Sequence, residues 1–369
     1  MAAGAAAGVA VERLTVGRGV RRQARVALDA AGPYGSLRGR EGTTRAEDGT
    51  GLHYEVDELP AEGKRRRPLR RPAAAGVTVV FCHGYCLGQD SWHFQRAALR
   101  GVARAVYWDQ RSHGRSDRGL GQADGEPVTI DLLGRDLKAV LDAAAPTGPL
   151  VLVGHSMGGM TIMALADQFP ELVRDRVLGV LLAGTSSGGL DQVTYGLPAV
   201  GITAVRRVLP GVLRALGSQV ELVEKGRRAT ADLFAGMIKR YSFGSRDVDP
   251  GVARFAERLI EATPIDVVAE FYPAFQVHDK AEALRHFEEI QVTVVAGDKD
   301  MITPAGHSEA IAAALPGADL VVLENTGHLL MLERPETVTG LLLDLLARAG
   351  VLPAATTVGS HGSSAQPGR

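Results

Sequence analysis

Residues 150–159 read Leu-Val-Leu-Val-Gly-His-Ser-Met-Gly-Gly. The first four residues are typical of a buried strand, and the apolar run that begins at Met160 suits a helix. Between them stands the pattern G-x-S-x-G, which predicts a very tight turn with Ser156 at its apex, where side chains at 154 and 158 would clash with neighbouring backbone. In this setting the pattern is typical of a turn that presents a serine nucleophile at a helix N-terminus, where the helix dipole favours negative charge.

The bulk composition is that of an ordinary soluble globular chain. Of its 369 residues, 45% are hydrophobic and 22% are charged, and the net charge of −1 creates no global field that would attract nucleic acid. The two cysteines, Cys82 and Cys86, form no disulfide framework and lack companion metal ligands, which suits a reducing compartment. No segment reaches the ~20 uncharged apolar residues that span a bilayer, so the sequence predicts a cytoplasmic protein.

Two basic runs, 18–25 and 64–71, leave a second location open. We interpret the first as part of a solvated arm and the second as a solvated loop, because prolines flank it and no aromatic residues interleave with its charges. The alternative is a weak peripheral contact with an anionic membrane. Each charge near such a surface contributes ~1 kcal/mol, so several on one face would suffice.

Strands and helices alternate along most of the chain. Alternating residues predict an early strand at 51–57, and apolar strand runs are predicted at 77–82, 103–108, 150–153, 177–183, 292–296 and 320–323. Helices are predicted at 91–100, 130–145, 157–169, 305–315 and 335–349. Continuous apolar strands that alternate with helices predict an α/β fold, with a mostly parallel central sheet covered by helices on both faces.

This rhythm divides the chain into five parts. A basic, Ala-rich arm covers 1–45, and the α/β core is predicted in two pieces at 46–187 and 286–350. Between the pieces, 188–285 has helical segments but no clear strand run, and is predicted to form a helical cap over the carboxyl ends of the strands. The tail at 351–369 has the composition of a disordered segment.

A candidate acid and a candidate histidine base follow late strands, in the order that a serine nucleophile requires. A serine hydroxyl needs a base within hydrogen-bond reach, and the base needs an orienting acid. After the strand at 292–296 come Asp298 and Asp300, and after the strand at 320–323 comes His328. We assign His328 as the base and favour Asp300 as the acid, because Asp298 is nearer the strand and suits a role in bonding loop backbone.

The tetrahedral intermediate of such a reaction needs pre-aimed donors for its oxyanion. The backbone N–H of Met157, directly after the nucleophile, is one predicted donor. The loop after the strand at 77–82 is predicted to supply the other through the N–H of Tyr85, with Gly84 allowing close approach of the backbone. His83 in the same loop is interpreted as a structural histidine rather than as a second base.

Six residues near these positions are candidates for the substrate pocket. For each of them, burial in the core or support of a loop is the competing interpretation, and aromatic residues in the cap are more often core than contact. The six are His83, Cys86, Trp92, His155, Phe271 and Tyr272.

Taken together, these motifs resemble the α/β-hydrolase fold superfamily, in the branch of serine esterases and cofactor-free haloperoxidases. The resemblance covers about 45–350 and rests on five segments: 83–84, 109–116, 154–159, 297–304 and 327–328. It implies an enzyme that needs no metal and no organic cofactor. Epoxide hydrolases and haloalkane dehalogenases of this fold carry an aspartate at the apex, so Ser156 implies acyl transfer instead.

The resulting expectation is a serine hydrolase that cleaves a small-molecule carboxylic ester or related acyl compound through an acyl-enzyme. Perhydrolysis or haloperoxidase chemistry, lipase activity, thioester cleavage and carbon–carbon bond cleavage stay open, because they use the same triad and differ in pocket shape. A ligand-binding protein with a vestigial triad is a further alternative. The sequence does not fix the oligomeric state.

Overall fold

The computed structural model describes residues 34–60, 76–123, 125–193, 211, 240–245 and 247–353. Eight strands form one sheet in the order β1-β2-β4-β3-β5-β6-β7-β8. Their bounds are Arg40–Arg45 (β1), Gly51–Asp57 (β2), Thr78–Cys82 (β3), Arg104–Trp108 (β4), Leu150–His155 (β5), Val177–Ala183 (β6), Gln291–Gly297 (β7) and Asp319–Leu323 (β8). β2 pairs antiparallel with β1 and β4, and β4, β3, β5, β6, β7 and β8 run parallel. The predicted fold class is confirmed.

The edge strand β1 is a correction to the sequence analysis, which placed its residues in the arm at 1–45. Its six residues contain no apolar side chain and are mostly exposed, so hydrophobic periodicity gives no sign of a strand. Main-chain pairing with β2 forms it instead, in a register that joins Arg40 to Val56 and Arg45 to Gly51. The sheet therefore begins at residue 40.

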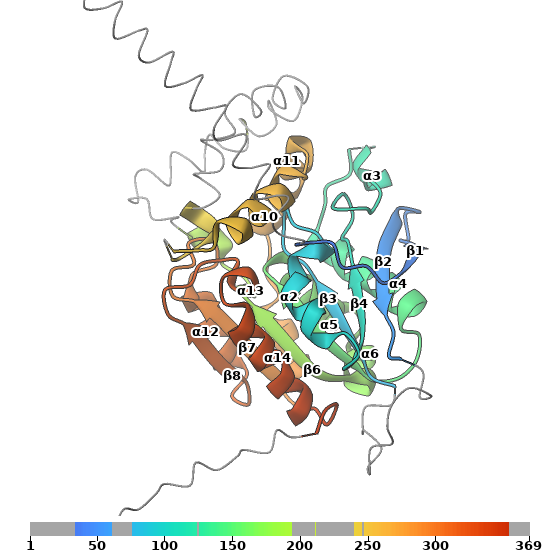
Figure 1. Cartoon of the computed structure of the whole chain (residues 1–369). Coiled ribbons are helices and arrows are strands. Elements are labelled where there is room, and N and C mark those ends of the chain that lie inside the picture. Colours follow the sequence, from blue (N-terminus) through green and yellow to red (C-terminus); the bar gives the residue numbers. More distant parts are fainter. Residues whose placement is uncertain are drawn as a thin grey trace, which may run out of the picture.

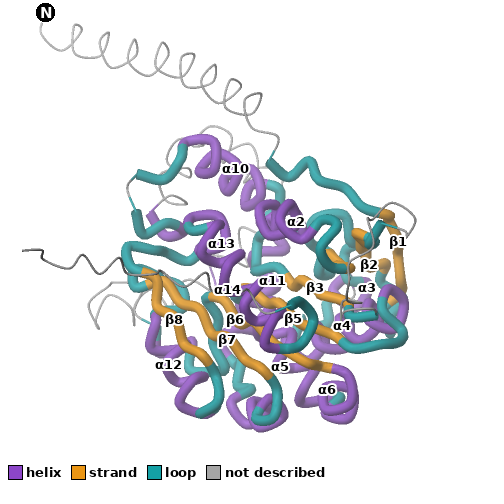
Figure 2. Tube along the Cα trace, turned by 60° about the horizontal axis from the view of Figure 1, so that its bottom comes forward, coloured by secondary structure: helices purple, strands orange, loops and turns teal. Residues whose placement is uncertain are grey.

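Helices cover both faces of the sheet. Outside the segment between β6 and β7, the longer helices are α2 (His93–Leu99), α4 (Ile130–Ala144), α5 (Met157–Gln168), α6 (Pro170–Arg176), α12 (Ala305–Ala314) and α14 (Pro335–Arg348). Shorter turns of helix are η2 (Gln89–Trp92), α3 (Leu120–Ala123) and α13 (Leu330–Glu333). Figure 2 shows α5, α6 and α12 on one side of the strands and α2 and α13 on the other.

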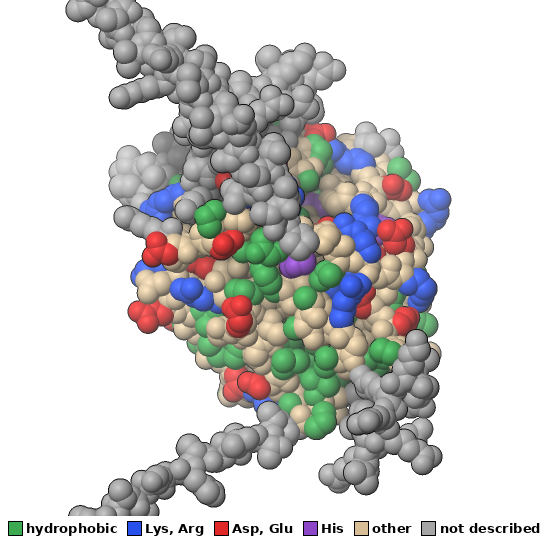
Figure 3. All heavy atoms as spheres, viewed as in Figure 1, with side chains coloured by type: hydrophobic (Ala, Val, Ile, Leu, Met, Phe, Trp, Pro, Cys, Tyr) green, Lys and Arg blue, Asp and Glu red, His purple; other side chains and the backbone are tan. Residues whose placement is uncertain are grey.

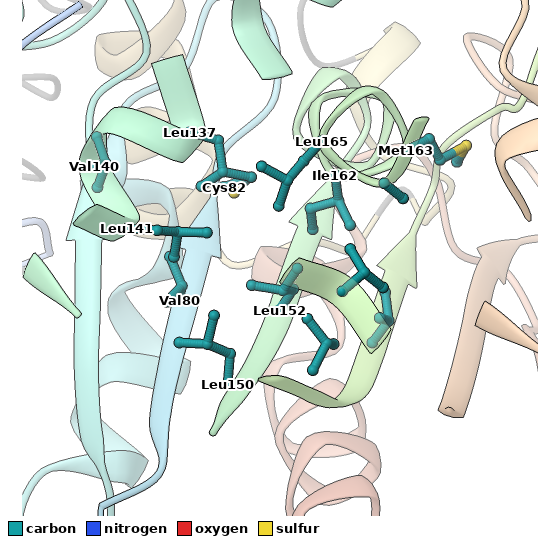
Figure 4. Close-up of a cluster of buried hydrophobic side chains, with 14 of the residues drawn as sticks. Val80, Cys82, Leu137, Val140, Leu141, Leu150, Leu152, Ile162, Met163 and Leu165 are labelled. Atoms are coloured by element: carbon teal, nitrogen blue, oxygen red, sulfur yellow. The ribbon is translucent and has the colours of Figure 1, made fainter. Parts of the chain in front are cut away.

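The hydrophobic core lies in two layers, one on each side of the sheet. In the layer shown in Figure 4, Leu137 and Leu141 of α4 and Ile162 of α5 face Val80 of β3 and Leu152 of β5. All five side chains are almost fully buried, and burial of a Leu, Ile or Val side chain stabilises the fold by roughly 1.5–3 kcal/mol. The packing of α5 against β5 holds the turn between them in a fixed place.

The segment between β6 and β7, which the sequence analysis predicts to be a helical cap, is helical in the parts that the structure describes, and its role as a cap stays a prediction. These parts contain η3 (Leu190–Gln192), α10 (Pro250–Glu261), α11 (Ile265–Gln276) and η4 (Ala281–Phe287). Figure 1 shows α10 and α11 at one end of the sheet, and Phe271 of α11 shares a buried cluster with Met157 at the start of α5. α11 therefore lies at the end of the sheet where the serine turn is located.

The basic runs 18–25 and 64–71 and most of the tail, 354–369, lie outside the described residues. On the face shown in Figure 3, described acidic and basic side chains are interspersed. None of the described helices has the length and apolar character needed to cross a membrane.

Candidate active site

Ser156 is the single residue between β5 and α5, and its backbone has a conformation that residues other than glycine rarely adopt. Its φ is 50° and its ψ is −119°, a combination that costs of order 1–3 kcal/mol and persists only where surrounding contacts enforce it. Two contacts do so, because the Ser156 N–H donates to the carbonyl of Ala183 at 3.0 Å and Thr185 Oγ1 donates to the Ser156 carbonyl at 2.7 Å. Ser156 is the N-cap of α5, where the helix dipole favours negative charge.

Three glycines around Ser156 let the backbone close this turn. A Cβ at position 154 would lie 2.7 Å from the Gly158 carbonyl oxygen, and one at 159 would lie 2.5 Å from Thr185 Oγ1. A Cβ at 158 would collide with the Cys82 carbonyl of β3. The clash predicted for positions 154 and 158 is thus present, and the sequence G-x-S-x-G-G is what this geometry requires.

His328 lies after β8 and faces the serine. Its Nε2 is 3.0 Å from Ser156 Oγ, a hydrogen-bond distance, although 172 residues separate the two in sequence. Both side chains are buried, so few water molecules compete for this contact. The pair has the arrangement in which an imidazole can accept a hydroxyl proton.

Asp300, in the turn after β7, bonds the other side of the imidazole. Its Oδ2 is 2.8 Å from His328 Nδ1 and accepts a hydrogen bond from Thr303 Oγ1, while Oδ1 accepts from the N–H groups of Ile302 and Thr303. Burial works against the charged form, but the adjacent His328 imidazole and these hydrogen bonds outweigh it, so the pKa of Asp300 lies below its usual value. Asp300 is therefore held as a carboxylate that fixes the His328 tautomer.

Asp298, the competing acid in the sequence analysis, has a different place. Its Oδ1 accepts a hydrogen bond from the Thr326 N–H at 3.1 Å, and its Oδ2 is 3.1 Å from Lys299 Nζ. It joins the loop after β7 to the loop that carries His328. Of the two aspartates, the structure brings Asp300 to the histidine.

The predicted oxyanion loop lies against the serine turn. A Cβ on Gly84 would lie 3.2 Å from Ser156 Cβ and 2.5 Å from His155 Nδ1, so only glycine allows this approach. Among the described residues, the structure records no hydrogen-bond acceptor for the N–H of Tyr85 or of Met157. The role of these two N–H groups as oxyanion donors stays a prediction.

The segment after β4 holds the loop after β3, the predicted oxyanion loop, in place. His113 Nε2 accepts a hydrogen bond from the Cys86 N–H at 3.2 Å, and Asp109 Oδ1 accepts one from the Gln89 N–H at 2.7 Å. His83 Nε2 likewise accepts from the Gln110 N–H at 2.9 Å. Cys86 has φ at +58°, a strained conformation for a non-glycine residue that these bonds enforce.

Two buried histidines near the site are held in the neutral form. His113 bonds Cys86 and the Arg111 carbonyl, and His155 bonds the His328 carbonyl at 2.8 Å. Burial, reinforced by a neighbouring histidine, lowers the pKa of each from 6.5 to about 3. Their Nε2 atoms thus play opposite parts, as an acceptor in His113 and as a donor in His155.

Stability is therefore expected to fall in mild acid. Because the folded-state pKa is depressed, the unfolded chain binds protons first, and the stability present above pH 6.5 is lost as the pH falls towards about 3. Each histidine is expected to lower the free energy of unfolding by about 2 kcal/mol between pH 7 and pH 5. Urea unfolding at both pH values measures the loss. His113→Gln should make the fall in the free energy of unfolding between pH 7 and pH 5 smaller, and the control His286→Gln should leave it unchanged. An equal fall in both variants would contradict the prediction.

The six pocket candidates have mixed positions. Trp92, His155, Phe271 and His83 have no exposed surface and are engaged in the core or in loop support. Cys86 and Tyr272 are partly exposed. Tyr85 adds a contact that the sequence analysis did not foresee, because its ring stacks on Phe271 and its hydroxyl donates to the Val268 carbonyl of α11 at 2.5 Å.

Thr303 and Thr185 were also missed by sequence reasoning. Thr303 Oγ1 contacts Asp300 and lies 3.3 Å from His328 Nδ1, and Thr185 fixes the carbonyl of Ser156. Their sole signal is position, since Thr185 follows the end of β6 and Thr303 lies three residues after Asp300. Threonine is too common in loops for that position to be decisive.

One group of described side chains has the spacing of metal ligands, namely Glu41, His53 and Glu55 at the edge of the sheet. Its carboxylates are already paired, with Arg115 Nη1 at 2.9 Å from Glu41 and Arg96 Nη2 at 2.6 Å from Glu55. Arg115 also pairs with Glu55. This concentration of positive charge does not fit a bound cation.

The chain is similar in sequence to a known protein family and to several known proteins. A model of the alpha/beta hydrolase fold family matches residues 77–335. An uncharacterized Mycobacterium tuberculosis protein is 27% identical over 271 residues, which is 70% of this chain and 72% of that protein. The dihydrolipoyllysine-residue acetyltransferase component of an acetoin cleaving system from Pseudomonas putida is 27% identical over 287 residues, covering 78% of this chain and 68% of that protein.

Among solved structures, a thermophilic esterase from Thermogutta terrifontis superposes with a TM-score of 0.62 at 22% identity. The match covers 84% of this chain and 99% of that chain. At this level of identity the likeness concerns the fold.

Proposed function

The chain belongs to the alpha/beta hydrolase fold family, and we propose that it is a serine hydrolase that cleaves carboxylic esters or related acyl compounds. One observation carries the proposal. A continuous chain of hydrogen-bond distances runs from Ser156 Oγ to His328 Nε2 at 3.0 Å and from His328 Nδ1 to Asp300 Oδ2 at 2.8 Å. A weak hydroxyl nucleophile, a base and an orienting carboxylate are the three groups that acyl transfer to serine requires.

In the proposed first half-reaction, Ser156 Oγ attacks the substrate carbonyl carbon while His328 Nε2 takes the hydroxyl proton. The tetrahedral intermediate collapses when the imidazolium of His328 donates that proton to the leaving alkoxide, which departs as an alcohol. Asp300 stabilises the imidazolium through Nδ1. In the second half, His328 deprotonates a water that attacks the acyl-enzyme, and the proton returns to Ser156 Oγ as the acid leaves.

The negative charge of the tetrahedral intermediate would be stabilised by the N–H groups of Tyr85 and Met157. Two observations support this: Gly84, which precedes Tyr85, approaches Ser156 closely, and Met157 is the first residue of α5. Preorganised donors at such a site contribute about 2.7–4 kcal/mol each to transition-state stabilisation. The fold of an esterase and the serine at the turn both support this assignment.

A fluorophosphonate probe tests the proposal. An activated serine displaces fluoride and forms a stable phosphonyl ester, so intact-protein mass spectrometry is expected to show one adduct per wild-type chain and peptide mapping to place it on Ser156. Ser156→Ala should give no adduct. An unlabelled wild type, or labelling that persists in Ser156→Ala, would overturn the proposed function.

Ser186→Ala is a matched control, because Ser186 also contacts a histidine. Its Oγ lies 2.9 Å from His307 Nδ1, but it donates to the Gly188 carbonyl at 2.7 Å and is fully buried. This variant is expected to be labelled at a rate close to that of wild type.

A further inference from the structure

The turn that carries His328, residues 326–329, lies between two other segments and packs closely against both. On one side, a Cβ at Gly297 would collide with the Thr326 carbonyl, and Lys299 N–H donates to that carbonyl at 2.9 Å. On the other side, a Cβ at Gly244 would lie 2.6 Å from the Thr326 carbonyl carbon. The histidine turn therefore packs backbone against backbone on both sides.

The second of these segments, 242–245, belongs to the region between β6 and β7. It crosses the histidine turn at two glycines, since a Cβ on Gly327 would in turn lie 2.5 Å from the Gly244 nitrogen. The Leu329 N–H donates to the Ser242 carbonyl at 2.9 Å, directly after the histidine. The position of His328 thus depends on a segment far from it in sequence.

One carboxylate joins the two crossing backbones. Glu333 Oε2 accepts from the Gly327 N–H at 2.7 Å and from the Gly244 N–H at 3.1 Å. Its Oε1 accepts from the Ser245 N–H at 2.6 Å. Hydrogen bonds to an ionised acceptor are stronger than neutral ones, and three of them converge on a single side chain five residues after His328.

We propose that Glu333 is a positioning residue for His328, which it holds by clamping the histidine turn to segment 242–245. This inference rests on the proposed role of His328 as the base. His328 must meet Ser156 and Asp300 at the same time, so a shift of its turn lengthens at least one of two contacts near 3 Å. A misplacement of about 1 Å can reduce catalysis by about 10²-fold.

Glu333→Gln tests the clamp with almost no change in volume. A glutamine offers one acceptor oxygen, so its NH₂ group must face at least one backbone N–H that the carboxylate now satisfies. We expect kcat for p-nitrophenyl acetate to fall by about 10- to 100-fold with KM nearly unchanged. Glu336→Gln is the matched control: Glu336 is exposed at the start of α14, and no hydrogen bond of its side chain is recorded within the described residues. It should retain wild-type kcat.

Gly244→Ala disturbs the same contact between the histidine turn and segment 242–245, because its Cβ would clash with the Thr326 backbone. It should give the same loss of kcat. It keeps the inference testable if Glu333→Gln does not fold. A folded Glu333→Gln or Gly244→Ala protein with wild-type kcat would overturn the inference, as would a loss of kcat in Glu336→Gln of equal size.

A second readout is independent of turnover. The proton between His328 Nδ1 and Asp300 is expected to give a low-field ¹H NMR signal that His328→Ala removes. We expect Glu333→Gln to shift or broaden this signal and Glu336→Gln to leave it unchanged. If wild type shows no hydrolysis or probe labelling, the proposed function fails, and the NMR comparison alone decides whether Glu333 positions His328. An unchanged signal in Glu333→Gln would then overturn the inference.

Discussion

Replacement of Ser156 by alanine is expected to lower kcat for p-nitrophenyl acetate by about 10⁴- to 10⁶-fold. The variant keeps His328, Asp300 and the backbone donors but has no atom that can form the acyl-enzyme. Removal of one hydroxyl leaves the packing of α5 against β5 unchanged, so circular dichroism should show a folded protein. Steady-state hydrolysis measured after active-site titration of wild type provides the comparison.

The corresponding double variant sharpens this result. In the proposed mechanism Ser156 and His328 act as one unit, so Ser156→Ala/His328→Ala should be scarcely less active than Ser156→Ala alone. The residual rate would come from substrate binding and the N–H groups of Tyr85 and Met157. If the fold-loss of kcat in the double variant equals the product of the fold-losses in the two single variants, the two residues act independently, contrary to the mechanism.

The second large effect is expected at the orienting acid. Asp300→Asn should lower kcat by about 10⁴-fold, because the amide no longer stabilises the imidazolium and its NH₂ group favours the wrong His328 tautomer. The side chain keeps nearly the same shape, so the loss is not one of packing. The pH dependence of kcat/KM, measured for wild type and variant, checks that the variant is compared at the optimum of each protein.

Asp298→Asn is the matched control for this prediction. Asp298 bonds the Thr326 N–H and Lys299 rather than the histidine, and asparagine retains an acceptor oxygen for that N–H. We expect a loss of less than tenfold. A larger loss of kcat in Asp298→Asn than in Asp300→Asn would show that Asp298, and not Asp300, is the orienting acid.

The parallel strands were predictable because a strand buried on both faces is a continuous apolar run. The run at 150–153 became β5, and 177–183 became β6 with the bounds expected. The strand β1 was missed for the same reason, since Arg-Glu-Gly-Thr-Thr-Arg forms a strand by main-chain pairing at an exposed edge. Hydrophobic periodicity detects burial and not pairing.

The pocket candidates show what residue type leaves open. Trp92 is a candidate because it follows the predicted oxyanion loop and Phe271 because it lies in the predicted cap, and the structure shows that both are fully buried. Tyr85 was chosen for its backbone, and its side chain links the oxyanion loop to α11. An aromatic residue has the same appearance in sequence whether it faces a cavity or a core.

The sequence by itself determined the fold class, the turn at Ser156 and the chain order of serine, aspartate and histidine. These depend on local patterns and on the rule that the carboxyl ends of parallel strands meet at one edge of a sheet. Only the tertiary structure decided that Asp300 rather than Asp298 meets His328, and that Glu333 ties the histidine turn to segment 242–245. The physical reason is that hydrogen bonds between residues distant in the chain are set by the packing of whole elements, which no local periodicity records.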